Sequence, residues 1–223
     1  MPRVARVDVG GEIYHVINRA NGRLQIFDTD EDYRLLEQLL LQTEEVTDMR
    51  ILAYELMPNH WHLILYPRND GDLAAFMHKL SNAHTRKVHA RTNTNGSGHL
   101  YQGRYKSFLV DSDNYLLAVI KYVERNAVRA KLVQHCEDWR WGSAWRRVYG
   151  TKEQKKLLDE LPIELPSDYV EWINTEDKQG DLDTIRNSVN KSVPYGKELW
   201  VDKMISKHHL ESTLRSPGRP KNK

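Results

Sequence analysis

The sequence predicts an α+β fold of the ferredoxin-like type, in which helices cover an antiparallel sheet. Four stretches rich in apolar, β-branched and aromatic residues are typical of strands. Two amphipathic stretches separate them in the order β-α-β-β-α-β, which is the order of the split β-α-β motif. The composition, with 39% hydrophobic and 29% charged residues among 223, favours a soluble globular chain.

The expected elements follow one another along the first part of the chain. Gly10 and Gly11 indicate a turn before the first strand, and Asp28 or Thr29 can cap the first helix. Strands are expected at residues 12–18, 50–57, 60–66 and 104–110, and helices at residues 28–45 and 72–91. A loop is expected at residues 93–98 and a further helix at residues 115–129.

The character of the sequence changes after Gly150, so we predict a first domain at residues 1–150 and a small helical C-terminal extension at residues 151–223. Helices are expected in the extension at residues 151–161, 183–189 and 198–206. The last ten residues contain four basic residues and no acidic one. The Pro-Gly-Arg-Pro stretch around Arg219 resembles the core of an AT-hook, whose arginine enters the minor groove of A·T-rich DNA. A disordered basic end explains the same composition.

Several classes of protein are excluded by composition. The chain contains no run of about 18 apolar residues, so we expect no transmembrane helix and no membrane partner. The first residues lack the apolar core of a signal peptide. Cys136 is the single cysteine, which excludes a disulfide framework within the chain and favours a cytoplasmic location.

An H-x-H motif at the start of the third expected strand is the stretch around which the chain is organised. His60 and His62 should share one face, because side chains at positions i and i+2 of a strand point the same way, while Trp61 points to the other face. Two neutral imidazoles provide half of a metal site. A zinc hydrolase is excluded, because H-E-x-x-H spacing and further cysteine ligands are absent. Two unrelated histidines are the alternative interpretation.

The helix expected at residues 115–129 carries side chains that can face this pair. Tyr122 and Asn126 are four residues apart, so they lie on one face of a helix. Asn126 would then be a third metal ligand, and Tyr122 a nucleophile beside the metal. Alternatively, Asn126 is a left-handed cap at a helix end and Tyr122 is a half-buried aromatic residue.

Basic residues are concentrated between positions 68 and 106, which contain seven lysines and arginines but only two aspartates. Histidines and tyrosines are interleaved with them. This composition favours single-stranded nucleic acid, because cations follow phosphates and rings stack on bases. An ordinary solvated helix surface is equally compatible. The candidate DNA-binding residues are Arg86, Lys87, Arg91, Arg104, Lys106 and, in the tail, Arg219.

Five stretches of the chain, taken together and in this order, resemble the motifs of REP-associated tyrosine transposases, which are single-tyrosine members of the HUH endonuclease superfamily. The stretches are residues 14–19 (YHVINR), 57–62 (MPNHWH), 98–107 (GHLYQGRYKS), 121–126 (KYVERN) and 138–143 (DWRWGS). The resemblance covers about residues 10–145. One departure is Ala127, since the family usually has proline after its asparagine.

The resemblance implies an HUH-type fold and a metal-dependent DNA endonuclease and strand transferase. The implied nucleophile is Tyr122, which forms a 5′-phosphotyrosine with single-stranded or REP-type hairpin DNA. The implied ligands of a Mg²⁺ or Mn²⁺ ion are His60, His62 and Asn126. Family members act as monomers or homodimers.

Two alternatives stay open. The same fold without cleavage activity would be a domesticated DNA-binding protein. Within the enzyme class, Tyr115 competes with Tyr122 as nucleophile, but Val119 stands four residues after it, where an Asn or Gln would be needed.

Overall fold

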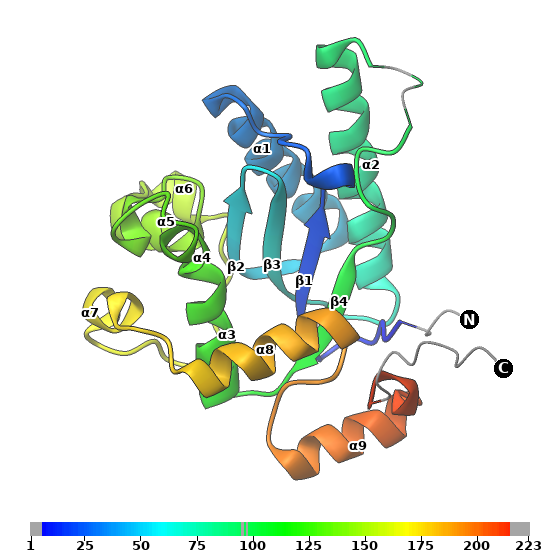
Figure 1. The fold of residues 1–223 in the computed structure, drawn as a ribbon, viewed down its shortest axis with the longest axis vertical. Helices are drawn as coiled ribbons and strands as arrows, with labels where there is room; N and C mark the ends of the chain where they lie inside the picture. Colours follow the sequence, from blue (N-terminus) through cyan, green and yellow to red (C-terminus); the bar gives the residue numbers. More distant parts are fainter. Residues whose placement is uncertain (1–5, 95, 97, 215–223) are drawn as a thin grey trace, which may run out of the picture.

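A four-stranded antiparallel sheet lies at the centre of the protein, whose computed structural model describes residues 6–94, 96 and 98–214 (Figure 1). The strands are β1 (Ile13–Arg19), β2 (Arg50–Met57), β3 (His60–Tyr66) and β4 (Lys106–Val110), in the spatial order β2-β3-β1-β4. Each pair of neighbouring strands is antiparallel. The predicted ferredoxin-like class is therefore confirmed.

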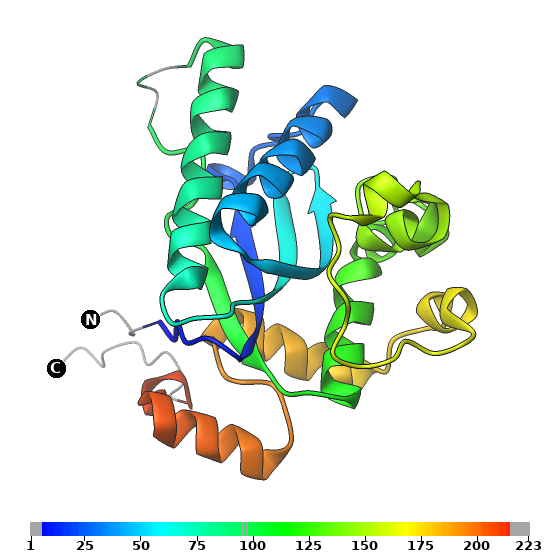
Figure 2. The same ribbon diagram turned by 180° about the vertical axis from the view of Figure 1, so that it is seen from behind.

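Helices cover both faces of this sheet (Figures 1 and 2). One face carries α1 (Asp30–Thr47) and α2 (Asp72–Thr92), and the other carries α3 (Asn114–Glu124) and α8 (Gln179–Lys191). Because strand side chains alternate between faces, the sheet has two apolar cores. Val16 and Leu63 pack with Leu36 of α1 on the first face, whereas Ile64 packs with Val123 of α3 on the second.

The remaining helical segments are short or lie in the C-terminal part of the chain. They are α4 (Asn126–Arg129), α5 (Ser143–Tyr149), α6 (Lys152–Lys155), α7 (Tyr169–Asn174), α9 (Glu198–His208) and the 3₁₀ turns η1 (Asn21–Arg23), η2 (Cys136–Asp138) and η3 (Glu211–Leu214). Within the described residues, no helix is both long enough and apolar enough to cross a membrane.

The helix predicted at residues 115–129 is in fact two helices, α3 and α4, separated at Arg125. The backbone N–H of Ala127 donates to Glu55 Oε1 of β2 at 3.3 Å instead of continuing the helix. Sequence periodicity cannot detect this break, because the acceptor belongs to a distant strand.

Two expectations for the extension are also corrected. The helix predicted at residues 151–161 is limited to α6, since Asp159 already accepts from the Ile51 N–H at 2.8 Å, alongside β2. Helix α7 was not predicted. By contrast, α8 and α9 lie close to the expected positions.

The C-terminal elements share the cores of the sheet and extend its edge. Leu157 and Met204 belong to the α1/α2 core, and Leu182 belongs to the α3 core. Tyr195 pairs with β4: its N–H donates to Leu109 O at 2.8 Å, and its carbonyl accepts from the Asp111 N–H at 2.8 Å. The unpaired edge of β4 is thereby partly covered.

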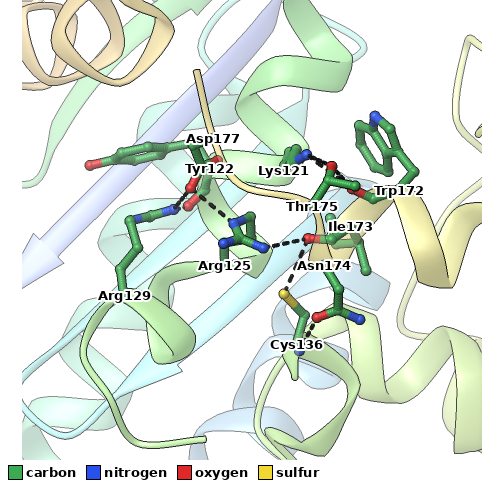
Figure 3. A network of polar contacts seen from close by, with 10 residues as sticks. All are labelled: Lys121, Tyr122, Arg125, Arg129, Cys136, Trp172, Ile173, Asn174, Thr175 and Asp177. Atoms are coloured by element: carbon green, nitrogen blue, oxygen red, sulfur yellow. Dashed lines mark hydrogen bonds and ion pairs between the residues drawn. The ribbon is translucent and has the colours of Figure 1, made fainter. Parts of the chain in front are cut away.

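A polar network fastens the segment between α7 and α8 to the end of α3 (Figure 3). Asp177 Oδ2 lies 2.9 Å from Arg125 Nε and 3.3 Å from Arg129 Nη1. The carboxylate is 10% exposed and the two guanidinium side chains 8% and 18%. One buried carboxylate thus compensates two cations, and Lys121 adds a bond to the Trp172 carbonyl at 2.9 Å.

Replacing Asp177 by alanine should leave two poorly solvated guanidinium groups without a counter-ion. Because removing one partner of a buried ion pair is strongly destabilising, we expect a loss of about 3 kcal/mol or more in the free energy of unfolding. Urea denaturation measures this loss. Glu176→Ala is the matched control, since its exposed carboxylate should contribute less than about 0.5 kcal/mol. Equal effects of the two variants would contradict the assigned role.

A second chain of buried polar groups crosses the α1/α2 core. Trp61 Nε1 donates to the Tyr101 hydroxyl at 2.9 Å, and this oxygen lies 2.5 Å from His84 Nδ1. The hydroxyl proton has no other acceptor among the described residues, so it is donated to His84. Burial lowers the pKa of His84 to about 4, so the ring is neutral in the folded protein.

This buried imidazole predicts a pH-dependent contribution to stability. The unfolded chain binds a proton at His84 below about pH 6.5, whereas the folded chain does so only near pH 4, so stability is lost as the pH falls through this range. The substitution His84→Leu removes this pH-dependent contribution to stability. Relative to wild type, the variant should therefore gain about 3 kcal/mol in unfolding free energy between pH 7 and pH 4. Denaturant unfolding at both pH values measures the change; a constant difference would refute it.

Candidate active site

His60 and His62 lie on the face of the sheet that α3 covers, as the strand periodicity predicts. Their ring centroids are 5.1 Å apart. Trp61 points to the opposite face, where it is fully buried and bonded to Tyr101. The predicted shared face of the two histidines is confirmed.

Each of these imidazoles has a hydrogen-bond partner at Nδ1. His60 Nδ1 lies 2.6 Å from Asn59 Oδ1, and His62 Nδ1 lies 2.8 Å from Nε2 of His15 on β1. The Asn59 amide is itself oriented, because its Nδ2 donates to Arg23 O at 3.3 Å. Neither Nε2 atom is hydrogen-bonded within the part of the chain that the structure describes. These two Nε2 atoms are therefore the ones available to a ligand.

The three histidines on this face are neutral because they are buried. Burial, together with the nearby Arg19 guanidinium, lowers the pKa of His60 to about 4. Burial also lowers the pKa of His15 to about 3 and, together with the two neighbouring histidines, holds the pKa of His62 well below 6.5. Neutral imidazole is the form that binds metal ions.

Tyr122 projects from α3 to the same place. Its ring centroid lies 6.0 Å from that of His62 and 6.1 Å from that of His15, and its side chain is 8% exposed. Burial raises the pKa of the phenol, while the Arg129 guanidinium, 4.5 Å from the ring centroid, acts in the opposite direction. Tyr115 instead packs edge-on against Tyr195, with 5.4 Å between ring centroids. Of the two candidate nucleophiles, Tyr122 is the one beside the histidines.

Asn126 begins α4 directly after the break that follows α3. It is not among the residues of positive φ, so its interpretation as a left-handed helix cap is wrong. The neighbouring Ala127 N–H is bound to Glu55, which lies opposite His62 in the β2–β3 ladder. The backbone at Asn126 is thus held near the histidine pair, and its side chain makes no hydrogen bond within the described residues.

The donor set has a clear consequence for a metal ion. Across residues 6–94, 96 and 98–214, no three His, Cys, Asp or Glu side chains are grouped so that they could hold one. Two imidazoles with open Nε2 atoms fit a metal, but the third protein ligand has to be of another type. Asn126 carries a carboxamide, whose oxygen is a donor of another type.

The basic residues singled out in the sequence fall into separate groups. Arg104 and Lys106 line a hollow of about 180 Å³ with Arg19, Gln102 and Asn190, beside the strand end that pairs with His60. Arg86 and Lys87 are exposed on α2. Arg91 forms an ion pair at 2.6 Å with the buried Asp32 at the start of α1. Arg219 lies outside the described residues.

Three residues of this face were not recognised from the sequence as members of the site: His15, Arg19 and Arg129. His15 and Arg19 occupy alternate positions of β1, and both face the histidine pair because β1 pairs with β3. The two-residue repeat of the strand predicts that His15 and Arg19 share one face, but the sequence does not show that β1 pairs with β3. Arg129 stands seven residues after Tyr122, and its guanidinium lies 4.5 Å from the Tyr122 ring centroid.

The antiparallel sheet thus carries two imidazoles with open Nε2 atoms beside a tyrosine of the helix that follows its last strand. The family model for IS200-like transposases matches residues 9–126, which is more than half of the chain. The chain therefore belongs to the IS200-like transposase family. The family resemblance inferred from the sequence motifs is thereby confirmed.

One solved structure agrees with this fold. A REP-associated tyrosine transposase bound to a REP hairpin superposes with a TM-score of 0.56 at 18% identity, covering 75% of this chain and 96% of that one. A chain from Deinococcus radiodurans R1, provisionally described as a transposase, gives a TM-score of 0.40 at 23% identity, covering 56% and 97%. The second likeness supports no inference. No curated protein matches the chain.

Proposed function

We propose that this protein is a metal-dependent single-strand DNA endonuclease and strand transferase of the transposase type. The observation that carries the proposal is the position of Tyr122. Its ring centroid lies 6.0 Å from that of His62, whose Nε2 atom is open. Membership of the IS200-like transposase family supports it independently.

Tyr122 is the nucleophile in this proposal. Its hydroxyl oxygen attacks a backbone phosphorus, the bond from phosphorus to the 3′ oxygen breaks, and the phenol proton passes to water. The 3′ oxygen takes up a proton, so the products are a 5′-phosphotyrosyl link and a free 3′-OH. Attack by a 3′-OH on that link reverses the step and rejoins DNA without an external energy source, as covalent catalysis allows.

The surroundings of Tyr122 act on this step in two ways. Burial disfavours the phenolate, which is a cost for a nucleophile whose ordinary pKa is already about 10. Arg129 offsets part of that cost, because its guanidinium lies against the ring. Asp177 holds Arg129 in place through an ion pair at 3.3 Å (Figure 3).

His60, His62 and Asn126 are the proposed ligands of a Mg²⁺ or Mn²⁺ ion. Such an ion, when bound, supplies a Lewis acid for the phosphate oxygens. The two imidazoles favour Mn²⁺ by affinity, while cellular abundance favours Mg²⁺. The residues of the chain contribute the open Nε2 atoms and hold them still through Asn59 and His15.

We propose single-stranded or REP-type hairpin DNA as the substrate, by analogy with the hairpin-bound structure. The hollow beside His60, with Arg19, Arg104 and Lys106, suits the phosphates of a strand leaving the site. Arg86, Lys87 and Arg219 are further proposed phosphate contacts. Arg91 is the weakest of the predicted contacts, because its guanidinium is paired with Asp32.

Tyr122→Phe should abolish a covalent protein–DNA adduct while leaving DNA binding within about twofold of wild type, since phosphate contacts provide most of the affinity. The measurement is incubation of labelled hairpin DNA with Mn²⁺, followed by denaturing electrophoresis. His60→Ala should also lose the adduct. Tyr115→Phe is the matched control and should retain it.

Two outcomes would count against this assignment. An adduct formed by Tyr122→Phe but not by Tyr115→Phe would transfer the role to Tyr115. Tight hairpin binding by wild type without any adduct, in Mg²⁺ or Mn²⁺, would favour the domesticated DNA-binding protein.

The double variant Arg104→Ala/Lys106→Ala should weaken binding of single-stranded DNA. It should also make the slope of log affinity against log salt concentration shallower by about 1.4, from two lost phosphate contacts at about 0.7 each. Fluorescence anisotropy over a salt series measures the slope. Lys152→Ala/Lys155→Ala, with two exposed lysines of α6, is the charge-matched control. An equal change in both double variants would show only a general charge effect.

A further inference from the structure

We infer that His15 is a positioning residue for His62: it accepts the Nδ1 proton of His62 and so keeps His62 Nε2 unprotonated and directed at the metal site. This inference rests on the proposed function, because it assigns His62 as a metal ligand. Its basis is the 2.8 Å contact between His15 Nε2 and His62 Nδ1, two side chains that are 0% and 2% exposed.

One proton lies between these two nitrogens, and its position decides whether His62 can bind a metal. If His62 Nδ1 carries the proton and donates to His15, the neutral His62 ring has a free lone pair at Nε2. If His15 Nε2 carries it, His62 Nδ1 is the acceptor and the His62 proton sits on Nε2, where it blocks coordination. Only the first arrangement is compatible with metal binding.

His60 differs from His62 in this respect. Its Nδ1 faces the Asn59 side-chain oxygen, which can only accept, so His60 carries its proton at Nδ1 in every state. The Asn59 amide cannot easily turn over, because its Nδ2 is bonded to Arg23 O. His60 is therefore permanently arranged as a ligand, whereas His62 depends on a partner that can either donate or accept.

The sheet holds His15 in the position that this role requires. In the β1–β3 ladder Ile17 is opposite His62, so His15 is the diagonal neighbour of His62 on the same face. Phe108 of β4 packs against the His15 ring, with 4.8 Å between centroids. The bond to His62 is the polar contact that the His15 ring makes among the described residues. Because His15 accepts at Nε2, its own proton sits on the buried Nδ1, which has no partner there, and metal coordination at His62 Nε2 has to offset the cost of this unpaired donor.

Two amide substitutions separate positioning from packing. The side-chain amide of Gln reaches the place of a histidine Nε2, whereas that of Asn reaches only the place of Nδ1. His15→Gln therefore keeps an acceptor for His62 Nδ1, and His15→Asn does not. In His15→Asn, the Nδ1-protonated form of His62 would bury an unpaired donor, so the proton should move to Nε2.

The first measurement is the binding of Mn²⁺ to the full-length protein without DNA. The electron paramagnetic resonance signal of the free ion reports how much Mn²⁺ is bound. We expect His15→Asn to weaken the Kd for Mn²⁺ at least tenfold, in the range typical for lost outer partners of a ligand, and His15→Gln to stay within about threefold of wild type. His60→Ala defines the signal that belongs to this site. Equal affinity of the Asn and Gln variants overturns the inference, and so does the absence of any His60-dependent binding in wild type.

The proton itself is observed by long-range ¹H–¹⁵N correlation spectra of histidine-labelled protein, with His62→Gln used for assignment. In wild type with saturating Mg²⁺, His62 should be protonated at Nδ1. In metal-free His15→Asn it should be protonated at Nε2. This readout on the wild-type protein holds even if a variant fails to fold, and a proton on His62 Nε2 in the Mg²⁺-loaded protein overturns the inference.

These results are distinguishable from a failure of the proposed function. If the Gln and Asn variants differ as expected but wild type forms no adduct with hairpin DNA, the cleavage proposal fails and the role of His15 stands. If wild type forms the adduct and His15→Asn binds Mn²⁺ as wild type does, the cleavage proposal stands and the role of His15 fails.

Discussion

β1 and β3 pair at the centre of the sheet with Arg19 opposite His60 and Ile17 opposite His62. A shift of one residue in this register would move the histidines to the α1/α2 face, because strand side chains alternate. It would also separate His62 from His15 and bring Trp61, which is fully buried on the other side, toward α3. The apolar residues that alternate with the histidines prevent such a shift, so the packing of the core fixes the geometry of the candidate site.

The other half of the site depends on an interruption in a helix. A continuous helix from Asn114 to Arg129 would keep Tyr122 and Asn126 in line along one face. Instead, Glu55 of β2 accepts the Ala127 N–H, and the helix is interrupted at Arg125. Ala127, which stands where the family usually has proline, is the donor of this bond. Proline could not make it, because proline has no backbone N–H. Glu55 thereby connects the strand beside His62 to the start of α4.

Burial has opposite consequences for the two kinds of side chain at this place. It keeps the imidazoles neutral, which suits metal binding, but it makes the phenol of Tyr122 harder to ionise. Arg129 compensates the second effect, and it can lie so close to the ring because Asp177 balances its charge. The segment between α7 and α8 therefore contributes to the environment of a tyrosine about fifty residues before it, although no chemistry is assigned to that segment.

The sequence by itself determined the features that depend on local periodicity. The shared face of His60 and His62 follows from the two-residue repeat of a strand, the cap of α1 near Thr29 from its capping pattern, and the ferredoxin-like class from the order of elements. The motif order also identified the family. The division at residue 150 stays a prediction, although later residues contribute to both cores.

Only the tertiary structure decided the features that depend on contacts between distant segments. These include the His15–His62 bond, the interruption of the helix at Arg125, the pairing of Arg91 with Asp32, and the grouping of Arg19 with Arg104. A single sequence carries the alternation of each strand but not the register between strands. Which polar group meets which therefore cannot be predicted until the strands and helices are packed together.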